Sequence, residues 1–194
     1  MHVHLSVVDK DGNNVFTVDK NKQPQGLFSH AIGGLLKTTP DFLSFYAPHS
    51  NSYRRLVHNA DHAPTTLSWG NENRTALIRL PEASAEATRL EFRVASADSN
   101  PYLVFASVLT SVYAGIQGKL QHDKETIGNA HAQHPPSLGV TWREAVEKTS
   151  VSSLVKDFFG EQFQQCYKCV KESEIKRFES TITDFEYHSY LRCL

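Results

Sequence analysis

Arginine and histidine side chains recur in short segments of the first half of the sequence. The segments are His2–His4, Asn51–Arg55, Asn73–Pro81 and Arg89–Arg93. Guanidinium groups grip carboxylates and phosphates through paired hydrogen bonds, and imidazole and carboxylate groups bind divalent metal ions. The residue types together therefore indicate a site for anions and a metal ion.

His2 and His4 are separated by a single apolar residue, Val3. In a β-strand, residues two positions apart point to the same face. The two imidazoles could therefore bind one metal ion, or one could bind a metal and the other a substrate anion. An ordinary surface strand explains the same pair.

Three arginines stand out in the next two segments. Arg54 and Arg55 are adjacent in a segment rich in Pro, Asn, Ser and His, where one guanidinium could grip a carboxylate or phosphate. Arg79 lies among apolar neighbours, where a charged side chain usually has a partner or a ligand. Surface salt bridges for the first pair, and an edge-strand arginine in solvent for Arg79, remain alternatives.

Arg89, Glu91 and Arg93 alternate with apolar residues, so a strand places the three on one face. Two flanking guanidinium groups lower the pKa of a carboxylate and keep it ionised. An ionised carboxylate suits a hard metal ion. A cross-strand ladder of ion pairs explains the alternation equally well.

The bulk composition argues against several classes of function. The 20 Lys and Arg residues nearly balance the 21 Asp and Glu residues, without the basic excess of nucleic-acid-binding proteins. No apolar run approaches the roughly 18 residues of a membrane span, and the start lacks the features of a secretory signal. The cysteines are too few for a disulfide framework, and the Cys166–Cys169 pair has no second pair for zinc. We expect a cytoplasmic protein that binds neither nucleic acid nor membrane.

The elements that must position these residues are strands early and helices late. Alternation predicts strands over residues 2–8, 15–18, 65–69, 76–80 and 90–94, the first two as a hairpin and the next two around a turn at 70–73. Helical spacing, and a capping box at Thr141 and Glu144, predict helices over residues 27–37, 41–46, 102–120, 141–148, 152–159, 161–181 and 184–191. Strands followed by helices, without βαβ alternation, predict an α+β fold.

Three further expectations concern surroundings. The helix over 102–120 is mostly apolar, so we expect it to be buried. We expect a loop over 47–64 and an irregular surface segment over 121–139. The strand at residues 2–8 needs a partner, which suggests that the chain starts within a domain.

Taken in order, the motifs resemble the second half of the catalytic domain of the glutamine synthetase family. They read MHVHLS, NSYRRLV, NRTALIRLP and RLEFRVASADSNPYL, followed by the long apolar helix, and cover residues 1–118. The later stretch FESTITDFEYHSYL resembles the family's last helices. The resemblance implies that 1–194 is the C-terminal part of that domain. It implies an antiparallel sheet with the active-site motifs in 1–120, helices in 121–194, and no N-terminal β-grasp domain.

The resemblance also implies an activity and residue roles. The family activates glutamate with ATP and a divalent metal, Mg²⁺ or Mn²⁺, and ammonia or, in some branches, an amine then displaces phosphate. The metal ligands would be His2 and Glu91. The glutamate-binding residues would be Arg55, Arg93 and Arg74. The ATP-binding residues would be His4, Ser6, Arg74, Arg79 and Arg89, with Arg74 also catalytic because it faces the transferred phosphoryl group.

One loop departs from the family pattern. Ammonia-using members carry a glutamate just before an Ala-Pro pair, where this chain has His62 preceded by Asp61. Either residue could take the catalytic role of that glutamate. Two segments are more similar to the branch that joins glutamate to polyamines or other amines. They read AIGGLLKTTPDFLSFYAPHSNSYRRL and LSWGNENRTA. Ammonia and amine chemistry therefore both remain open.

The resemblance implies a homo-oligomer for full-length members, because family active sites form between neighbouring subunits. We therefore expect the 194-residue chain to be incomplete and inactive alone. Two other readings are a non-catalytic relative of the family and an arginine-rich anion-binding module. The second explains each motif but not their order.

Overall fold

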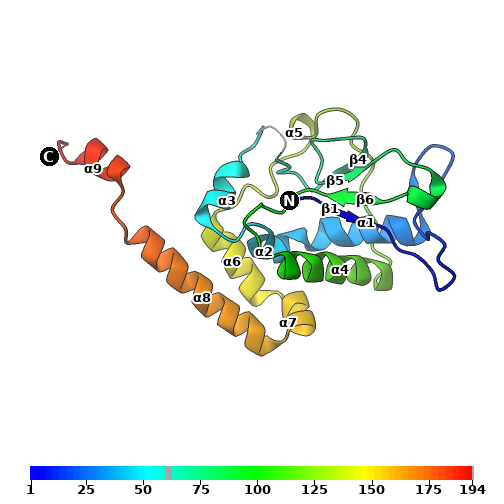
Figure 1. Cartoon of the computed structure of the whole chain (residues 1–194). Helices are drawn as coiled ribbons and strands as arrows, with labels where there is room; N and C mark the ends of the chain where they lie inside the picture. Colours follow the sequence, from blue (N-terminus) through cyan, green and yellow to red (C-terminus); the bar gives the residue numbers. More distant parts are fainter. Residues whose placement is uncertain (60–62, 194) are drawn as a thin grey trace.

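A computed structural model describes residues 1–59 and 63–193 of the chain. Its main sheet has the strand order β1-β6-β5-β4 (Figure 1), several helices lie between β1 and β4 in the sequence, and the chain after β6 is helical. The strands of this sheet are β1 (Val3–Leu5), β4 (Trp69–Asn71), β5 (Ile78–Leu80) and β6 (Leu90–Phe92). The predicted α+β class, with early strands and a helical C-terminal part, is confirmed.

Glu91 lies at the centre of the sheet because β6 pairs antiparallel with both of its neighbours. His4 of β1 stands opposite Glu91 on one side, and Arg79 of β5 stands opposite it on the other. Three of the residues singled out in the sequence are thereby brought side by side, although they are far apart in the chain. The sheet itself assembles the candidate site.

The predicted hairpin between residues 2–8 and 15–18 forms only next to its turn. There the Val15 amide donates to the Val7 carbonyl at 2.8 Å and an antiparallel bridge joins Val8 to Asn14, whereas β1 itself pairs with β6. The second segment forms β2 (Thr17–Val18), which pairs with β3 (Pro24–Gln25) in a separate ribbon. β1 therefore has a partner within this chain, β6, and stands at the edge of the described sheet.

The pair β4–β5 differs from the predicted arrangement as well. A turn at residues 70–73 predicts antiparallel strands, whereas the two strands run parallel, with Trp69 opposite Ile78. Parallel strands usually need long connections. Here each strand has three residues, so the short connection over 72–77 has to retrace only about 10 Å.

The helices α1 (Gly26–Thr38) and α4 (Pro101–Gln117) lie side by side in Figure 1. Glycines permit their close approach, since a Cβ atom on Gly34 would lie 2.7 Å from the Cα atom of Gly115. Thr38 adds a buried hydrogen bond, donating from Oγ1 to Ser111 Oγ at 2.7 Å. The apolar residues of both helices join those of the sheet in one hydrophobic core.

The expectation that the α4 segment is buried throughout is wrong. Val104, Val108 and Val112 face the core, but Tyr102 is 83% exposed and Leu109 is 58% exposed. The helix carries no charged residue, so the sequence does not distinguish its inner face from its outer face. This outer face is apolar and largely exposed, and at Tyr113 it contacts Phe158 of α7, with 5.8 Å between the ring centres.

The C-terminal helices follow the sequence closely. They are α6 (Trp142–Val151), α7 (Ser153–Phe159), α8 (Glu161–Glu179) and α9 (Asp184–Tyr190). The predicted capping box of Thr141 and Glu144 opens α6. Tyr167 fixes α8 to the body by donating a 2.9 Å hydrogen bond to the Ser44 carbonyl, while α9 stands away from the body in Figure 1.

Short elements also occur where loops were predicted. The segment 47–64 contains α3 (Ser50–Arg55), and the segment 121–139 contains α5 (Ala130–Gln133). Leu138 is fully buried, so the second segment is partly internal. The remaining short helices are η1 (Thr39–Phe42), α2 (Leu43–Tyr46) and η2 (Ala85–Ala87). Within residues 1–59 and 63–193, no helix combines the length and apolar character needed to cross a membrane.

Candidate functional site

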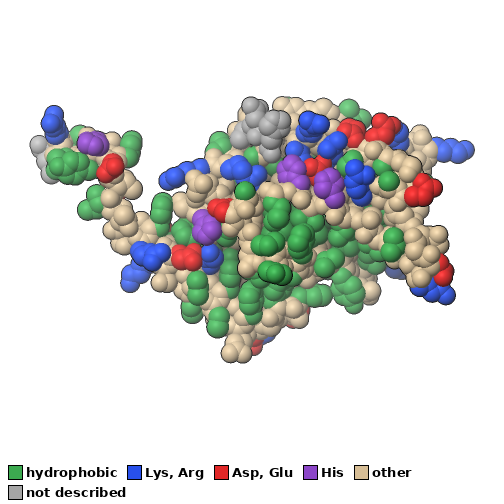
Figure 2. All heavy atoms as spheres, in the orientation of Figure 1, with side chains coloured by type: hydrophobic (Ala, Val, Ile, Leu, Met, Phe, Trp, Pro, Cys, Tyr) green, Lys and Arg blue, Asp and Glu red, His purple; other side chains and the backbone are tan. Residues whose placement is uncertain are grey.

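Glu91 is the centre of a charged cluster on one face of the sheet. The Nδ1 atom of His2 lies 2.7 Å from Glu91 Oε1, and Arg79 Nη1 donates to Glu91 Oε2 at 3.0 Å. Arg93 Nε lies 3.6 Å from Glu91 Oε1. We call these four residues the Glu91 cluster. Figure 2 shows histidine, arginine and acidic side chains gathered over the strands near the N-terminus.

The cluster holds Glu91 ionised and His2 neutral. Burial acts to raise the pKa of Glu91, but the hydrogen bond from Arg79 and the charges of Arg93 and Arg79 outweigh it, so the pKa lies below its ordinary value. Burial is also the largest influence on His2 and lowers its pKa; the charge of Glu91 opposes this effect and Arg93 adds to it. A carboxylate and a neutral imidazole are therefore available together at neutral pH.

This donor pair fits a divalent cation in part. Carboxylate oxygen suits Mg²⁺, and Mn²⁺ accepts both oxygen and imidazole nitrogen. No group of three or more His, Cys, Asp or Glu side chains arranged for a metal occurs in the described part of the chain. His2 and Glu91 can thus supply two ligands, and the others must come from water, a phosphate or another polypeptide segment.

Arg93 joins the cluster to the segment that precedes β5. Its side chain is 3% exposed, and its Nη1 donates to the carbonyl oxygens of Arg74 and Ala76. Arg74 is held there by its backbone while its side chain is exposed. The structure therefore places the predicted catalytic arginine, Arg74, beside the cluster with its guanidinium on the surface.

Arg55, the last residue of α3, contacts the chain just after β6, the strand that carries Glu91. Its Nη2 donates to the carbonyl oxygen of Val94 and lies 3.4 Å from Ser96 Oγ. The Nε atoms of Arg55, Arg79 and Arg93 are buried without a hydrogen-bond partner among the described residues. Each of these guanidinium groups can therefore make further hydrogen bonds if it turns.

The predicted ATP-binding residues separate into two groups. Arg89 Nε lies 3.4 Å from His4 Nδ1, and Arg89 Nη1 donates to the Ala87 carbonyl at 3.1 Å. These two residues continue the charged face along β1 and β6. Ser6 is exposed just beyond the end of β1, and no contact joins it to the cluster within the described residues.

Asp61 and His62, the predicted catalytic residues of the loop, lie outside the described residues. His58, which precedes them, packs edge to face against His131, with 5.3 Å between the ring centres. His131 is 8% exposed and its Nδ1 lies 3.2 Å from Thr65 Oγ1. The start of this loop is thereby attached to α5.

Sequence reasoning missed Glu72. Arg79 Nη2 donates to Glu72 Oε2 at 2.6 Å, so Arg79 bridges two carboxylates. The hydrogen bond from Arg79 is the main reason that the pKa of Glu72 lies below its ordinary value. No local pattern marks this residue, because its contact with Arg79 depends on the parallel pairing of β4 and β5.

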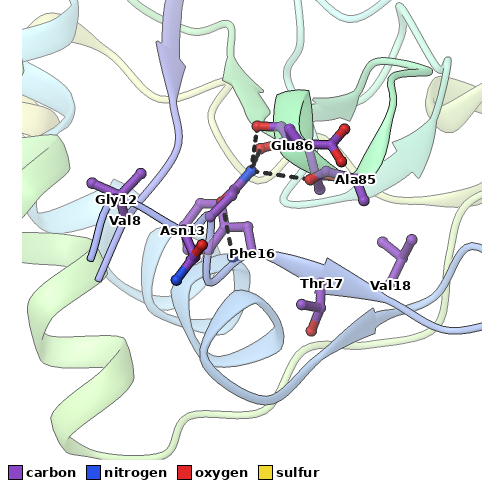
Figure 3. A pocket seen from close by; sticks show the side chains of 10 residues that line it. Val8, Gly12, Asn13, Phe16, Thr17, Val18, Ala85 and Glu86 are labelled. Atoms are coloured by element: carbon purple, nitrogen blue, oxygen red, sulfur yellow. Dashed lines mark hydrogen bonds between the residues drawn. The ribbon is translucent and has the colours of Figure 1, made fainter. Parts of the chain in front are cut away.

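A cavity of about 430 Å³ was also missed. It lies between the turn at residues 12–18 and η2, where the side chain of Asn14 donates to the carbonyls of Ala85, Glu86 and Thr88 (Figure 3). Its walls include none of the predicted site residues. The Glu91 cluster is therefore separate from this cavity and stands on the open face of the sheet.

Comparison with known proteins places the whole cluster inside one matched region. A family model described as "Glutamine synthetase, catalytic domain" matches residues 1–190. The gamma-glutamylputrescine synthetase of Escherichia coli is 32% identical over 96% of this chain and 39% of its own length. The gamma-glutamylethanolamide synthetase of Streptomyces coelicolor is 32% identical over 95% of this chain and 39% of its own length. The glutamine synthetase of Thermotoga maritima is 33% identical over 98% of this chain and 45% of its own length.

Proposed function

Since the chain belongs to the glutamine synthetase catalytic-domain family, we propose that it forms the phosphate- and metal-binding side of an ATP-dependent ligase. The ligase joins the γ-carboxylate of glutamate to ammonia or an amine. The chain spans less than half the length of the relatives described above, so this activity is proposed for the whole protein. The 194-residue chain alone is expected to be inactive, since residues 1–59 and 63–193 offer two of the metal ligands, His2 and Glu91.

The Glu91 cluster is the observation that carries the proposal. It combines an ionised carboxylate, a neutral imidazole and two guanidinium groups within hydrogen-bonding distance or close to it. Phosphoryl transfer spreads negative charge over the moving group, and cations fixed around that group stabilise the charge. A cluster of this composition suits a phosphate chain better than it suits an uncharged substrate.

The proposed reaction has two balanced steps. An oxygen of the glutamate γ-carboxylate attacks the γ-phosphorus of ATP, the bond to ADP breaks, and γ-glutamyl phosphate forms. The nitrogen of ammonia or an amine then attacks the acyl carbon, inorganic phosphate leaves, and the nitrogen loses a proton. The intermediate is prone to hydrolysis, so the complete site must also exclude water.

In this proposal the residues divide the tasks, and Arg74 takes part in more than one. His2 and Glu91 hold Mg²⁺ or Mn²⁺, which supplies charge neutralisation at the phosphates. Arg79 and the exposed Arg74 contact the phosphates, with Arg74 at the transferred group. His4, Ser6 and Arg89 bind other parts of ATP. Arg55, Arg93 and Arg74 bind glutamate, and Asp61 or His62 serves the nitrogen acceptor.

Two of these tasks require movement. Arg93 donates to two carbonyl oxygens and is buried, so it can bind glutamate only if the segment before β5 shifts. Arg55 likewise donates a hydrogen bond from Nη2 to the Val94 carbonyl, so this nitrogen is already engaged. Their buried Nε atoms supply the donors that such a shift can expose.

Relatives named for ammonia and for amine chemistry match this chain equally well. Their identities range from 32% for two amine ligases to 33% for a glutamine synthetase. Ammonia and amine chemistry are therefore both kept, and we expect the whole protein to act as a homo-oligomer in the cytoplasm. A non-catalytic role in the same fold is the alternative.

The proposal is tested by phosphate release from ATP by the whole protein. Glutamate and Mn²⁺ are supplied together with ammonia, putrescine or ethanolamine. We expect release that requires both glutamate and a nitrogen acceptor, and the acceptor that supports it identifies the branch. Absence of glutamate-dependent release with every acceptor, together with no binding of ATP, would establish the non-catalytic alternative.

A further inference from the structure

Arg79 is shared between two carboxylates, although the cluster requires only one of them. Its Nη1 donates to Glu91 at 3.0 Å and its Nη2 donates to Glu72 at 2.6 Å. The Glu72 side chain is 48% exposed, so burial does not hold it there. Arg79 therefore has a second, shorter contact at the outer rim of the cluster.

The backbone of Glu72 is unusual. Its φ angle is +49°, in the left-handed region that residues other than glycine and asparagine rarely adopt. The amide of Glu72 donates to the Leu80 carbonyl at 3.0 Å, and its carboxylate accepts from the amide of Glu82. Several hydrogen bonds thus hold an unfavourable backbone conformation that points this carboxylate towards Arg79.

Both oxygens of Glu91 are engaged in the described structure. His2 lies against one oxygen and Arg79 donates to the other. A carboxylate that accepts a hydrogen bond from a guanidinium group is a poorer ligand, because part of its charge is neutralised and a lone pair is occupied. Arg79 and a divalent cation therefore compete for Glu91.

We propose that Glu72 is a positioning residue of this site. Its carboxylate holds Nη2 of Arg79 and so weakens the competition of Arg79 with a cation for Glu91. With Glu72 in place, Arg79 remains neutralised when Glu91 turns to a cation. Without Glu72, Arg79 depends on Glu91 alone. This inference rests on the proposed role of His2 and Glu91 as metal ligands.

The test uses the whole protein with Mn²⁺ as the only added ligand, and Mn²⁺ binding is measured by electron paramagnetic resonance. Glu72→Gln should weaken Mn²⁺ binding by about three- to fivefold, the size of a partly exposed ion pair. Arg79→Gln should strengthen binding, because the competitor is gone. In the Arg79→Gln background, Glu72→Gln should leave the affinity unchanged.

Glu82→Gln is the matched control. It makes the same chemical change at a nearby exposed carboxylate, whose partner is Lys22 rather than Arg79. Its Mn²⁺ affinity should equal that of the unmodified chain. Glu72→Asn supplies a second variant whose side chain tolerates a positive φ and is too short to reach Arg79 in the same way.

The outcomes separate this inference from the proposed function. A metal-free nitrogen-15 spectrum of the Arg79 guanidinium should shift in Glu72→Gln and stay the same in Glu82→Gln. If Mn²⁺ binding requires His2 but is the same in Glu72→Gln, or if Glu72→Gln weakens it equally in the Arg79→Gln background, the positioning role is wrong. If the Arg79 spectrum shifts as expected but His2→Ala leaves Mn²⁺ binding unchanged, the proposed metal pair is wrong instead.

Discussion

The substitution Gly34→Ala tests whether the close crossing of α1 and α4 supports the sheet. The added Cβ atom would lie 2.7 Å from the Cα atom of Gly115 and 2.9 Å from its amide nitrogen. These are backbone atoms, so the helices must separate. Overpacking of this kind costs about 1–3 kcal/mol, whereas alanine gains about 1 kcal/mol over glycine in a helix interior. Because backbone cannot rotate away, the clash should cost about 2–3 kcal/mol, in the upper half of that range, which leaves a net loss of about 1–2 kcal/mol.

The assay is thermal unfolding followed by circular dichroism. A loss of that size lowers the Tm by about 3–6 °C in a chain of this length. Gly139→Ala is the control, since its Cβ would meet Pro136 at 3.5 Å, an ordinary contact. A Tm for Gly34→Ala equal to or above that of the unmodified chain would refute the packing argument.

Three further predictions follow from the same structure. Burial and the charge of His58 lower the pKa of His131 below its ordinary value of 6.5 in the folded protein. The unfolded state therefore binds more protons, and the free energy of unfolding should fall as the pH drops through that value. His131→Gln should reduce this fall, which is measured by urea unfolding between about pH 7.5 and about pH 5.5. Thr141→Ala removes the cap of α6 and should cost about 1 kcal/mol in the same assay, whereas no loss would show that the cap is dispensable. Leu109→Gln, on the exposed face of α4, should change stability by less than about 0.5 kcal/mol, and a larger loss would mean that this face is covered.

Local patterns predicted the elements whose signals are contained in a few residues. The capping box at Thr141 and the helical spacing over 27–37 became the expected helices, and the alternation at residues 2–8 became a strand over Val3–Leu5 alone. The alternation of Arg89, Glu91 and Arg93 likewise predicted that Glu91 and Arg93 share a face, and Arg93 Nε lies 3.6 Å from Glu91 Oε1. These signals succeed because neighbouring residues alone decide them.

Pairing between distant segments could not be predicted in the same way. β1 pairs with β6, so that Val3 stands opposite Phe92, a residue far away in the sequence. β4 pairs with β5 in parallel across a short connection. The residues of a single strand do not show which strand it pairs with or in which direction. The contact of Glu72 with Arg79 depends on that parallel pairing, which explains why Glu72 was overlooked.

The prediction that α4 is buried was wrong on its exposed face for a different reason. Periodicity distinguishes an inner face only when the outer face is polar, and α4 has apolar residues on both. The family resemblance, by contrast, was confirmed because it used the order of several motifs. The individual roles of Arg55, Arg74 and Arg93 remain predictions, since they concern substrates.

The central claim is that the Glu91 cluster makes an acyl phosphate from glutamate. Hydroxylamine attacks acyl phosphates whatever the natural amine is, so hydroxamate formation by the whole protein measures this step directly. With ATP, Mn²⁺, glutamate and hydroxylamine, we predict hydroxamate formation that falls about tenfold or more in Glu91→Gln and is unchanged in Glu82→Gln. Hydroxamate formation at the unmodified rate in Glu91→Gln would contradict the account.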